Sequence, residues 1–161
     1  MSNRPKVFIS GDTDFPAWAM LLVRRSIRTA LMEEGVNIPC EISVLFTDDA
    51  GIQVINREQR NIDAPTDVLS FPAFQFTPGR FDPRDGAPDP ETGRLPLGDM
   101  ALNLDRIRSQ GEEYGHGPKR ETAYLTVHSV LHLLGYDHLD EGVQKKQMRE
   151  KEEKIMRLIR L

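Results

Sequence analysis

The segment from Lys119 to Leu134 constrains the fold more than any other part of the chain. It predicts one helix that is apolar around most of its circumference, where Leu125, Val127, Val130 and Leu131 are found. A helix of this kind is normally buried in the middle of a domain, because other elements must cover every side of it. The remaining elements are therefore expected to pack around this helix.

The other expected elements are short strands and amphipathic helices separated by turn residues. Runs rich in apolar and β-branched residues, bounded by Gly, Pro and Asp, predict strands over residues 5–10, 41–47, 67–71 and 97–102. Apolar residues near helical spacing predict helices over residues 17–34, 48–59 and 105–114, and a last helix after residue 140. Residues 73–96 are rich in Gly and Pro and predict a long loop with room for an irregular hairpin at its base.

This order of elements predicts an α+β fold. We expect one compact domain over residues 1–161, with a small, mostly four-stranded mixed sheet packed with about five helices and no clean βαβ alternation. The buried helix would be a zincin-like metal helix. Cys40 is the single cysteine, which excludes an intramolecular disulfide and with it a disulfide-stapled secreted scaffold.

Charge and apolar run length exclude several classes of partner. The net charge is −4, so the molecule as a whole does not attract a polyanion, and contact with a nucleic acid requires a local basic patch. No apolar run is long enough for a secretory signal or for a membrane span, which needs about 20 apolar residues. We therefore expect a cytoplasmic protein without a membrane partner.

Three of the four histidines lie close together at the end of the buried helix. His128 and His132 are four residues apart, so both rings project from one helical face and can ligate one ion. Gly135 follows where the helix should end, and a glycine can reverse the chain through the left-handed conformation. That reversal can bring His138 toward the same ion. Three imidazoles with one open position form a hydrolytic zinc site, in which the pKa of bound water falls to about 7.

The histidine spacing matches that of the metalloproteases, H-E-x-x-H-x-x-G-x-x-H, except at one position. Ser129 stands where that motif has the glutamate that acts as general base. A serine hydroxyl does not take a proton from zinc-bound water near neutral pH, so peptide hydrolysis by the usual route is not expected. A zincin-like metalloprotease with displaced machinery remains one alternative. A structural zinc, with Asp137 or the more distant His116 in the fourth position, is another.

The segment from His128 to His138 resembles the signature of the bacterial YbeY endoribonucleases. Two further blocks carry the same resemblance, Asn56-Arg57-Glu58-Gln59-Arg60 followed by residues 63–72, and Leu97-Gly98-Asp99-Met100. The blocks have the order and the approximate spacing that the family shows. This chain departs from the family pattern at Ser129, where Gly is more usual, and at Gln59, where an aromatic residue is more usual. Its loop over residues 73–96 is also longer than in many relatives.

The resemblance implies a single-strand-specific metallo-endoribonuclease. Members of the family act in maturation of the 3′ end of small-subunit ribosomal RNA and in ribosome quality control. The resemblance also implies one Zn²⁺ per chain and a role for Arg60 in activity. The partners that it implies are single-stranded RNA, ribosomal RNA and the small ribosomal subunit, with an assembly GTPase or a small-subunit protein as candidate protein partners. A non-catalytic ribosome-assembly factor with a structural zinc remains an alternative.

Three of the candidate site residues have an interpretation from their chemistry. The guanidinium of Arg60 can hold a phosphodiester through two hydrogen bonds and stabilise charge that develops on it, although an arginine at a helix C-terminus is also favourable by itself. The nucleophile would be either metal-bound water or a 2′-hydroxyl of the RNA. Asp137 and Asp99 are candidates to accept hydrogen bonds from the imidazole N–H groups that face away from the metal.

Basic residues on the first helix are the candidates for RNA binding. Arg24, Arg25 and Arg28 form a cluster, and positions 24 and 28 share a helical face. They are either a stripe that contacts RNA phosphates or an ordinary solvated helix face. Lys119 and Arg120, at the start of the metal helix, could extend such a stripe.

Overall fold

The computed structural model describes residues 3–137 and 142–161 and shows an α+β domain. The described elements follow the chain as β1 (Lys6–Gly11), α1 (Ala17–Glu33), β2 (Cys40–Thr47), α2 (Asp49–Arg60), β3 (Val68–Pro72), the 3₁₀ turn η1 (Pro83–Asp85), β4 (Leu95–Asn103), α3 (Leu104–Glu113), α4 (Gly117–Leu133) and α5 (Val143–Ile159). The predicted fold class, a small mixed sheet with five helices, is therefore confirmed.

The strands form one mixed sheet in the order β1-β2-β4-β3. β1 pairs parallel with β2, and β2 pairs parallel with β4. β3 pairs antiparallel with β4 at one edge of the sheet. Its last residue, Pro72, has no N–H to donate, which an edge strand tolerates and a central strand does not. The sequence indicated no clean βαβ alternation, but β1, α1 and β2 do form one βαβ unit, because α1 crosses over between two parallel neighbours.

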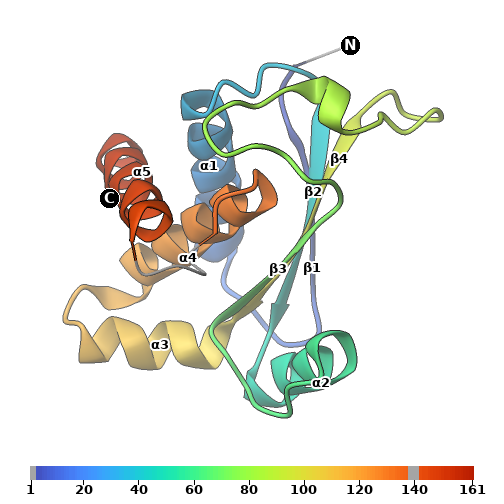
Figure 1. Ribbon diagram of the computed structural model, residues 1–161. Coiled ribbons are helices and arrows are strands. Elements are labelled where there is room, and N and C mark those ends of the chain that lie inside the picture. Colours follow the sequence, from blue (N-terminus) through green and yellow to red (C-terminus); the bar gives the residue numbers. More distant parts are fainter. Residues whose placement is uncertain (1–2, 138–141) are drawn as a thin grey trace.

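Helices cover the two faces of the sheet unequally (Figure 1). The large core lies on the face covered by α1 and α4, and it includes Val44 and Met100 from the strands. α2 lies on the opposite side, over a small second cluster formed by Ile52, Leu69 and Ala101. The sheet therefore has one face toward α4 and the other toward α2, and this separation decides which side chains can reach the histidines.

The buried helix predicted from residues 119–134 is α4. It contacts α1, α3, α5, β3 and β4, and its residues Leu125, Val127, Val130 and Leu131 are buried. Because neighbours surround α4, its side chains are held in place on every side. A rigid helix of this kind is a suitable support for ligands that must stay within a fraction of an ångström of one another.

The long loop between β3 and β4 is attached to the core by aromatic side chains. Phe76 is buried, and its ring centroid lies 6.2 Å from that of Phe74 and 5.1 Å from that of Phe81. An isolated bridge between Thr77 and Arg80 forms the only hairpin-like feature that the structure describes in this loop. The loop can therefore form one wall of a cleft without regular secondary structure.

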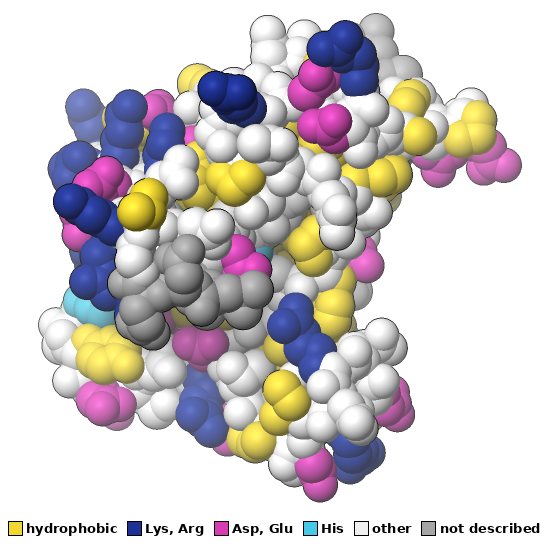
Figure 2. Space-filling view, viewed as in Figure 1, with side chains coloured by type: hydrophobic (Ala, Val, Ile, Leu, Met, Phe, Trp, Pro, Cys, Tyr) yellow, Lys and Arg dark blue, Asp and Glu magenta, His cyan; other side chains and the backbone are white. Residues whose placement is uncertain are grey.

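Positive charge gathers on one part of the surface although the chain is acidic overall. Figure 2 shows Lys and Arg side chains concentrated over α5, at the left of the view.

No helix within the described residues is both long and apolar enough to cross a lipid bilayer.

Asn103 joins three elements at the end of β4. Its side-chain oxygen caps α3 by accepting from the backbone N–H of Asp105, 3.0 Å away. Its amide donates to the Asp49 carboxylate at 2.6 Å and to the Thr66 carbonyl at 2.9 Å. Asn103 is fully buried, so its own polar atoms depend on these partners.

We predict that Asn103→Ala lowers the free energy of unfolding by about 2–4 kcal/mol, because it removes a helix cap and the two further hydrogen bonds that the buried amide donates. Urea unfolding followed by circular dichroism measures this change. The matched control is Ser109→Ala, whose exposed hydroxyl contacts only a carbonyl of its own helix, and it should stay within about 0.5 kcal/mol of the wild type. Equal effects of the two substitutions would contradict this account of the junction.

Candidate metal centre

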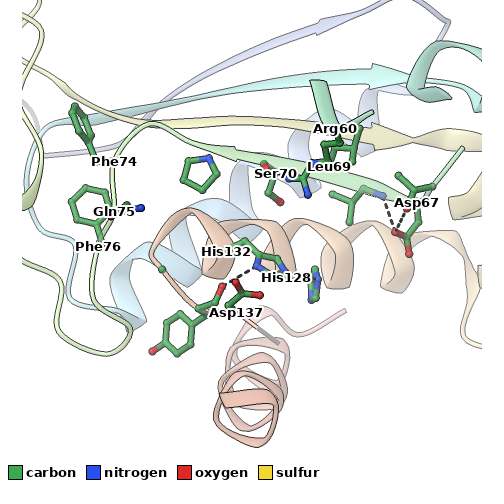
Figure 3. Close-up of a pocket in the computed structure, with 15 residues that line it drawn as sticks. Arg60, Asp67, Leu69, Ser70, Phe74, Gln75, Phe76, His128, His132 and Asp137 are labelled. Carbon is green, nitrogen blue, oxygen red and sulfur yellow. Dashed lines mark hydrogen bonds between the residues drawn. The ribbon is translucent and has the colours of Figure 1, made fainter. Parts of the chain in front are cut away.

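A cleft of about 760 Å³ opens between α4 and the edge strand β3 (Figure 3). His128 and His132 from α4 form one wall, and Ser70 from β3 lies on the opposite side with Arg60 from the end of α2. The loop after β3 contributes Phe76 at one end of the cleft. The cleft therefore gathers residues from two of the three blocks that resemble the family, and none from Leu97-Gly98-Asp99-Met100.

The two histidine rings face each other on one side of α4. The Nε2 atoms of His128 and His132 are 3.0 Å apart, and the ring planes meet at 79°. Two imidazole nitrogens on one tetrahedral zinc, with Zn–N bonds of about 2.0–2.1 Å, would be about 3.3 Å apart. The observed separation is close to that value, so the pair fits a shared metal ion.

Each ring is held from behind by an oxygen acceptor. Nδ1 of His128 lies 2.6 Å from Oε2 of Glu152, and Nδ1 of His132 lies 2.9 Å from the carbonyl oxygen of Tyr136. A carbonyl can only accept, so Nδ1 of His132 carries the proton and Nε2 is the acceptor nitrogen of that ring. The Glu152 carboxylate favours the same tautomer of His128. The lone pairs of the two Nε2 atoms face each other, and a cation bound between them would remove their repulsion. Oxygen acceptors at Nδ1 are typical of metal-binding histidines.

The turn after α4 supplies one of these acceptors. Gly135 has a φ of 102°, as predicted for a glycine that ends a helix. The Tyr136 N–H bonds to the Leu131 carbonyl at 3.0 Å and the Gly135 N–H bonds to the His132 carbonyl at 3.1 Å, which together form a Schellman motif. This motif places the Tyr136 carbonyl against the His132 ring. A Cβ at Gly135 would also collide with the Phe76 carbonyl, so the turn requires glycine twice over.

Glu152 is the site residue that the sequence did not indicate. It lies in α5, whose many Lys and Glu residues predict a solvated helix, yet its side chain is buried against α4. The Tyr124 hydroxyl donates to its second oxygen at 3.3 Å. Burial raises the pKa of the Tyr124 phenol, and the Glu152 carboxylate raises it further, so Tyr124 remains a proton donor. Glu152 and His128 lie on different helices and meet only when α5 packs on α4, so no local sequence pattern marks the pair.

A hydrogen-bond chain links the metal helix to Arg60. The hydroxyls of Ser70 and Ser129 are 2.7 Å apart and buried, which ties β3 to α4 beside His128. The Ser70 carbonyl in turn accepts a hydrogen bond of 2.6 Å from the Arg60 guanidinium. That guanidinium also lies over the Phe71 ring, 5.3 Å from its centroid. Ser129, one of the two positions at which this chain departs from the family pattern, therefore has a structural partner.

The structure separates the other predicted residues. Asp137 lines the cleft beside His132. His138 lies outside the described residues, and those residues contain no group of three His, Cys, Asp or Glu side chains placed to hold one ion. His116 stands at the start of α4, about 18 Å along the helix from His128 by helical rise, and its Nε2 lies 2.7 Å from Glu121.

Asp99 does not lie with the histidines. It is two residues from Ala101 in β4, so both side chains point to the α2 face of the sheet, opposite to Met100 and α4. It lines a separate cleft of about 380 Å³ with Ser43 and Phe71. The candidate role of Asp99 as a partner of the imidazole N–H groups therefore has no support in this geometry.

The arginine cluster on α1 is partly engaged within the chain. The Arg24 guanidinium donates to the Val7 carbonyl at 2.7 Å. Arg25 donates to the carbonyl of Ile159 at the end of α5 and contacts the next carbonyl, of Arg160, at 3.3 Å. Arg28 is half-buried. Two of these three side chains therefore hold β1 and the end of α5 within the chain itself.

Comparison with known proteins places the chain in a family. The family model described as Endoribonuclease YbeY matches residues 12–160. The chain belongs to the YbeY family of endoribonucleases. A protein named Endoribonuclease YbeY from Clostridium kluyveri is 48% identical over 146 residues, which cover 87% of this chain and 88% of that protein. A protein of the same name from Clostridium botulinum is 46% identical over 149 residues, or 86% and 87% of the two chains.

A solved structure has the same fold. The solution structure of TM1509 from Thermotoga maritima superposes with a TM-score of 0.63 and covers 95% of this chain and 88% of that one. Its sequence identity is 20%, so the comparison bears on the fold alone. The arrangement of sheet and helices around α4 is therefore shared with a protein of distant sequence.

We predict that Ser129→Ala lowers the free energy of unfolding by about 1–3 kcal/mol, because it leaves the buried Ser70 hydroxyl without its partner. Ser70→Ala should have a similar effect for the same reason. The double substitution should cost less than the sum of the two, since neither hydroxyl then remains buried and unsatisfied. Urea unfolding of the four proteins measures the coupling. Strictly additive effects would show that the two hydroxyls do not interact.

Proposed function

We propose that this chain is a zinc-dependent endoribonuclease that cuts single-stranded RNA. The observation that carries the proposal is the pair of imidazoles in one cleft, each held at Nδ1 by an acceptor, with the Arg60 guanidinium on the opposite wall. Membership of the YbeY family supports RNA as the substrate. We further propose that the chain acts in the cytoplasm on the 3′ end of 16S ribosomal RNA and in ribosome quality control, with the small subunit and an assembly GTPase or small-subunit protein as partners.

His128, His132 and His138 would hold the ion, one per chain. The donor set suits zinc, because three neutral imidazoles leave one position open for chemistry. When bound, the ion supplies Lewis-acid chemistry at the phosphodiester. Glu152 and the Tyr136 carbonyl keep the two described rings in the tautomer that presents Nε2, and this orientation is the contribution of the chain itself.

Arg60 would bind the phosphodiester and stabilise the charge that develops on it. A guanidinium has five N–H donors in a fixed fork, and the hydrogen bond to the Ser70 carbonyl takes only one of them. The contact with the Phe71 ring helps to fix the plane of the fork. The side chain is therefore both exposed and oriented, as required of a group that must meet charge in the transition state.

Ser129 is unsuited to the role of the protease glutamate. Its hydroxyl is buried and bonded to that of Ser70, so it does not face the cleft as a base. A peptidase of the usual zincin kind would need a carboxylate at this position. The geometry therefore favours phosphodiester over peptide cleavage.

We predict that zinc-loaded protein cleaves a single-stranded RNA and leaves the matching duplex intact. Removal of the metal by a chelator, or the substitution His132→Ala, should abolish cleavage, while Arg60→Ala should lower kcat by about 10²–10³-fold. Gel analysis of end-labelled RNA measures these rates. Equal cleavage by wild type and His132→Ala would reveal a contaminating nuclease, and intact RNA with fully loaded wild type would overturn the proposal.

The chemistry of the substrate separates the two candidate nucleophiles. If a 2′-hydroxyl of the RNA attacks, a single 2′-deoxy nucleotide at the cleavage position stops the reaction. If water attacks, the same substrate is still cut at that position. Both outcomes are read from one gel and neither depends on a protein variant.

We predict that Glu152→Gln weakens zinc affinity by about 10–100-fold, because the amide is a poorer acceptor for Nδ1 of His128 than the carboxylate is. Competition with a chromogenic chelator measures the affinity. The matched control is Glu153→Gln, which removes the same charge from the adjacent exposed position of α5. Equal affinities of the two variants would show that Glu152 does not orient the ring.

A further inference from the structure

A second cleft, of about 490 Å³, lies between α4 and α5. Arg120 and Tyr124 from α4 line one side, and Arg149 and Arg157 from α5 line the other. α5, which forms one side of this cleft, is the helix over which Lys and Arg side chains gather in Figure 2. We refer to this group of four residues as the arginine cleft.

Among the residues that the structure describes, 3–137 and 142–161, the guanidinium groups of the arginine cleft (Arg120, Arg149 and Arg157) form no ion pair with a carboxylate. Two glutamates also line the cleft, but Glu152 is buried and bonded to His128, whereas Glu153 is exposed. Three exposed cations therefore meet at one place on a chain whose net charge is −4.

The arginine cleft adjoins the metal centre. The Tyr124 ring centroid lies 6.0 Å from that of His128, and the Tyr124 hydroxyl contacts the same carboxylate that holds His128. Tyr124 is 37% exposed and lines the arginine cleft, while its ring lies beside His128, which lines the metal cleft. A polymer held at the histidine pair can therefore continue past Tyr124 onto the three arginines.

We propose that the arginine cleft binds the phosphates of single-stranded RNA beyond the bond that is cut, with Tyr124 as a surface on which a base stacks. The inference rests on the proposed function and extends it to a second part of the substrate. Guanidinium groups suit phosphates because they donate two parallel hydrogen bonds, and aromatic rings accept any base by stacking. The acidic chain needs such a local basic patch to hold a polyanion. This proposal assigns RNA binding to α4 and α5 in place of Arg24 and Arg25, whose guanidinium groups donate to backbone carbonyls.

The test measures binding of the zinc-loaded protein to a 2′-O-methyl oligonucleotide at several salt concentrations. The methyl group blocks attack by a 2′-hydroxyl, and a gel of the recovered oligonucleotide checks that water has not cut it. On single strands, each phosphate contact contributes about 0.7 to the slope of log affinity against log salt. Each of Arg120→Gln, Arg149→Gln and Arg157→Gln should therefore lower the slope by about 0.7. Arg84→Gln is the matched control, because Arg84 is an exposed arginine in η1 that pairs with Asp82, and its slope should equal that of the wild type.

Tyr124 has its own pair of variants. Tyr124→Ala should weaken oligonucleotide binding by about fivefold or more, because the stacking surface is lost. Tyr124→Phe keeps the ring and should bind as the wild type does, although it loses the hydrogen bond to Glu152. Equal weakening by both would assign the effect to Glu152 and overturn the stacking role.

Cleavage assays of the same proteins separate this inference from the proposed function. If the wild type cleaves RNA while the arginine variants keep its salt slope and its KM, the arginine cleft does not bind substrate. If all four arginine variants, including Arg84→Gln, lose the same slope, the effect is one of net charge and the inference is also overturned. If the wild type binds the oligonucleotide with the predicted slopes but cleaves no RNA, the arginine cleft stands and the proposed catalytic function fails.

Discussion

The hydrogen bond between Nδ1 of His128 and the Glu152 carboxylate joins the central helix α4 to the last helix of the chain. Burial of α4 fixes the positions of both histidines, but burial alone does not fix the direction in which each ring presents its acceptor nitrogen. Glu152, on the neighbouring helix α5, fixes the orientation of the His128 ring. The Schellman turn at Gly135 fixes that of the His132 ring through the Tyr136 carbonyl. The geometry of the proposed metal centre therefore depends on one tertiary contact and one local turn.

The local turn could be predicted from the sequence, and the tertiary contact could not. The spacing of His128 and His132 and the helix end at Gly135 follow from helical geometry, which operates over a few residues. Glu152 looks like any glutamate of a charged helix until α5 is docked on α4. The Ser70–Ser129 hydrogen bond is similar, because two serines far apart in sequence carry no signal of their contact.

Asp99 shows how a sheet can defeat sequence reasoning. The side chains of a strand alternate between faces, so one additional residue reverses every assignment beyond it. The pairing of β2 with β4 shifts in register between Glu41 and Ile42, opposite Pro96 and Gly98. Past this irregularity Asp99 points toward the α2 side, away from the histidines. The strand could be predicted from its composition, but the face of the sheet on which each side chain lies could not, because the register shift arises only when the two strands pair.

The measurement that tests the central claim most directly is the zinc content of the folded chain by elemental analysis, after removal of any affinity tag. The account predicts about one zinc per chain in the wild type and a large loss in His128→Ala, with both proteins folded by circular dichroism. A wild type that remains folded, is supplied with zinc and still holds no stoichiometric metal would contradict the account, because the paired imidazoles would then serve some purpose other than binding an ion.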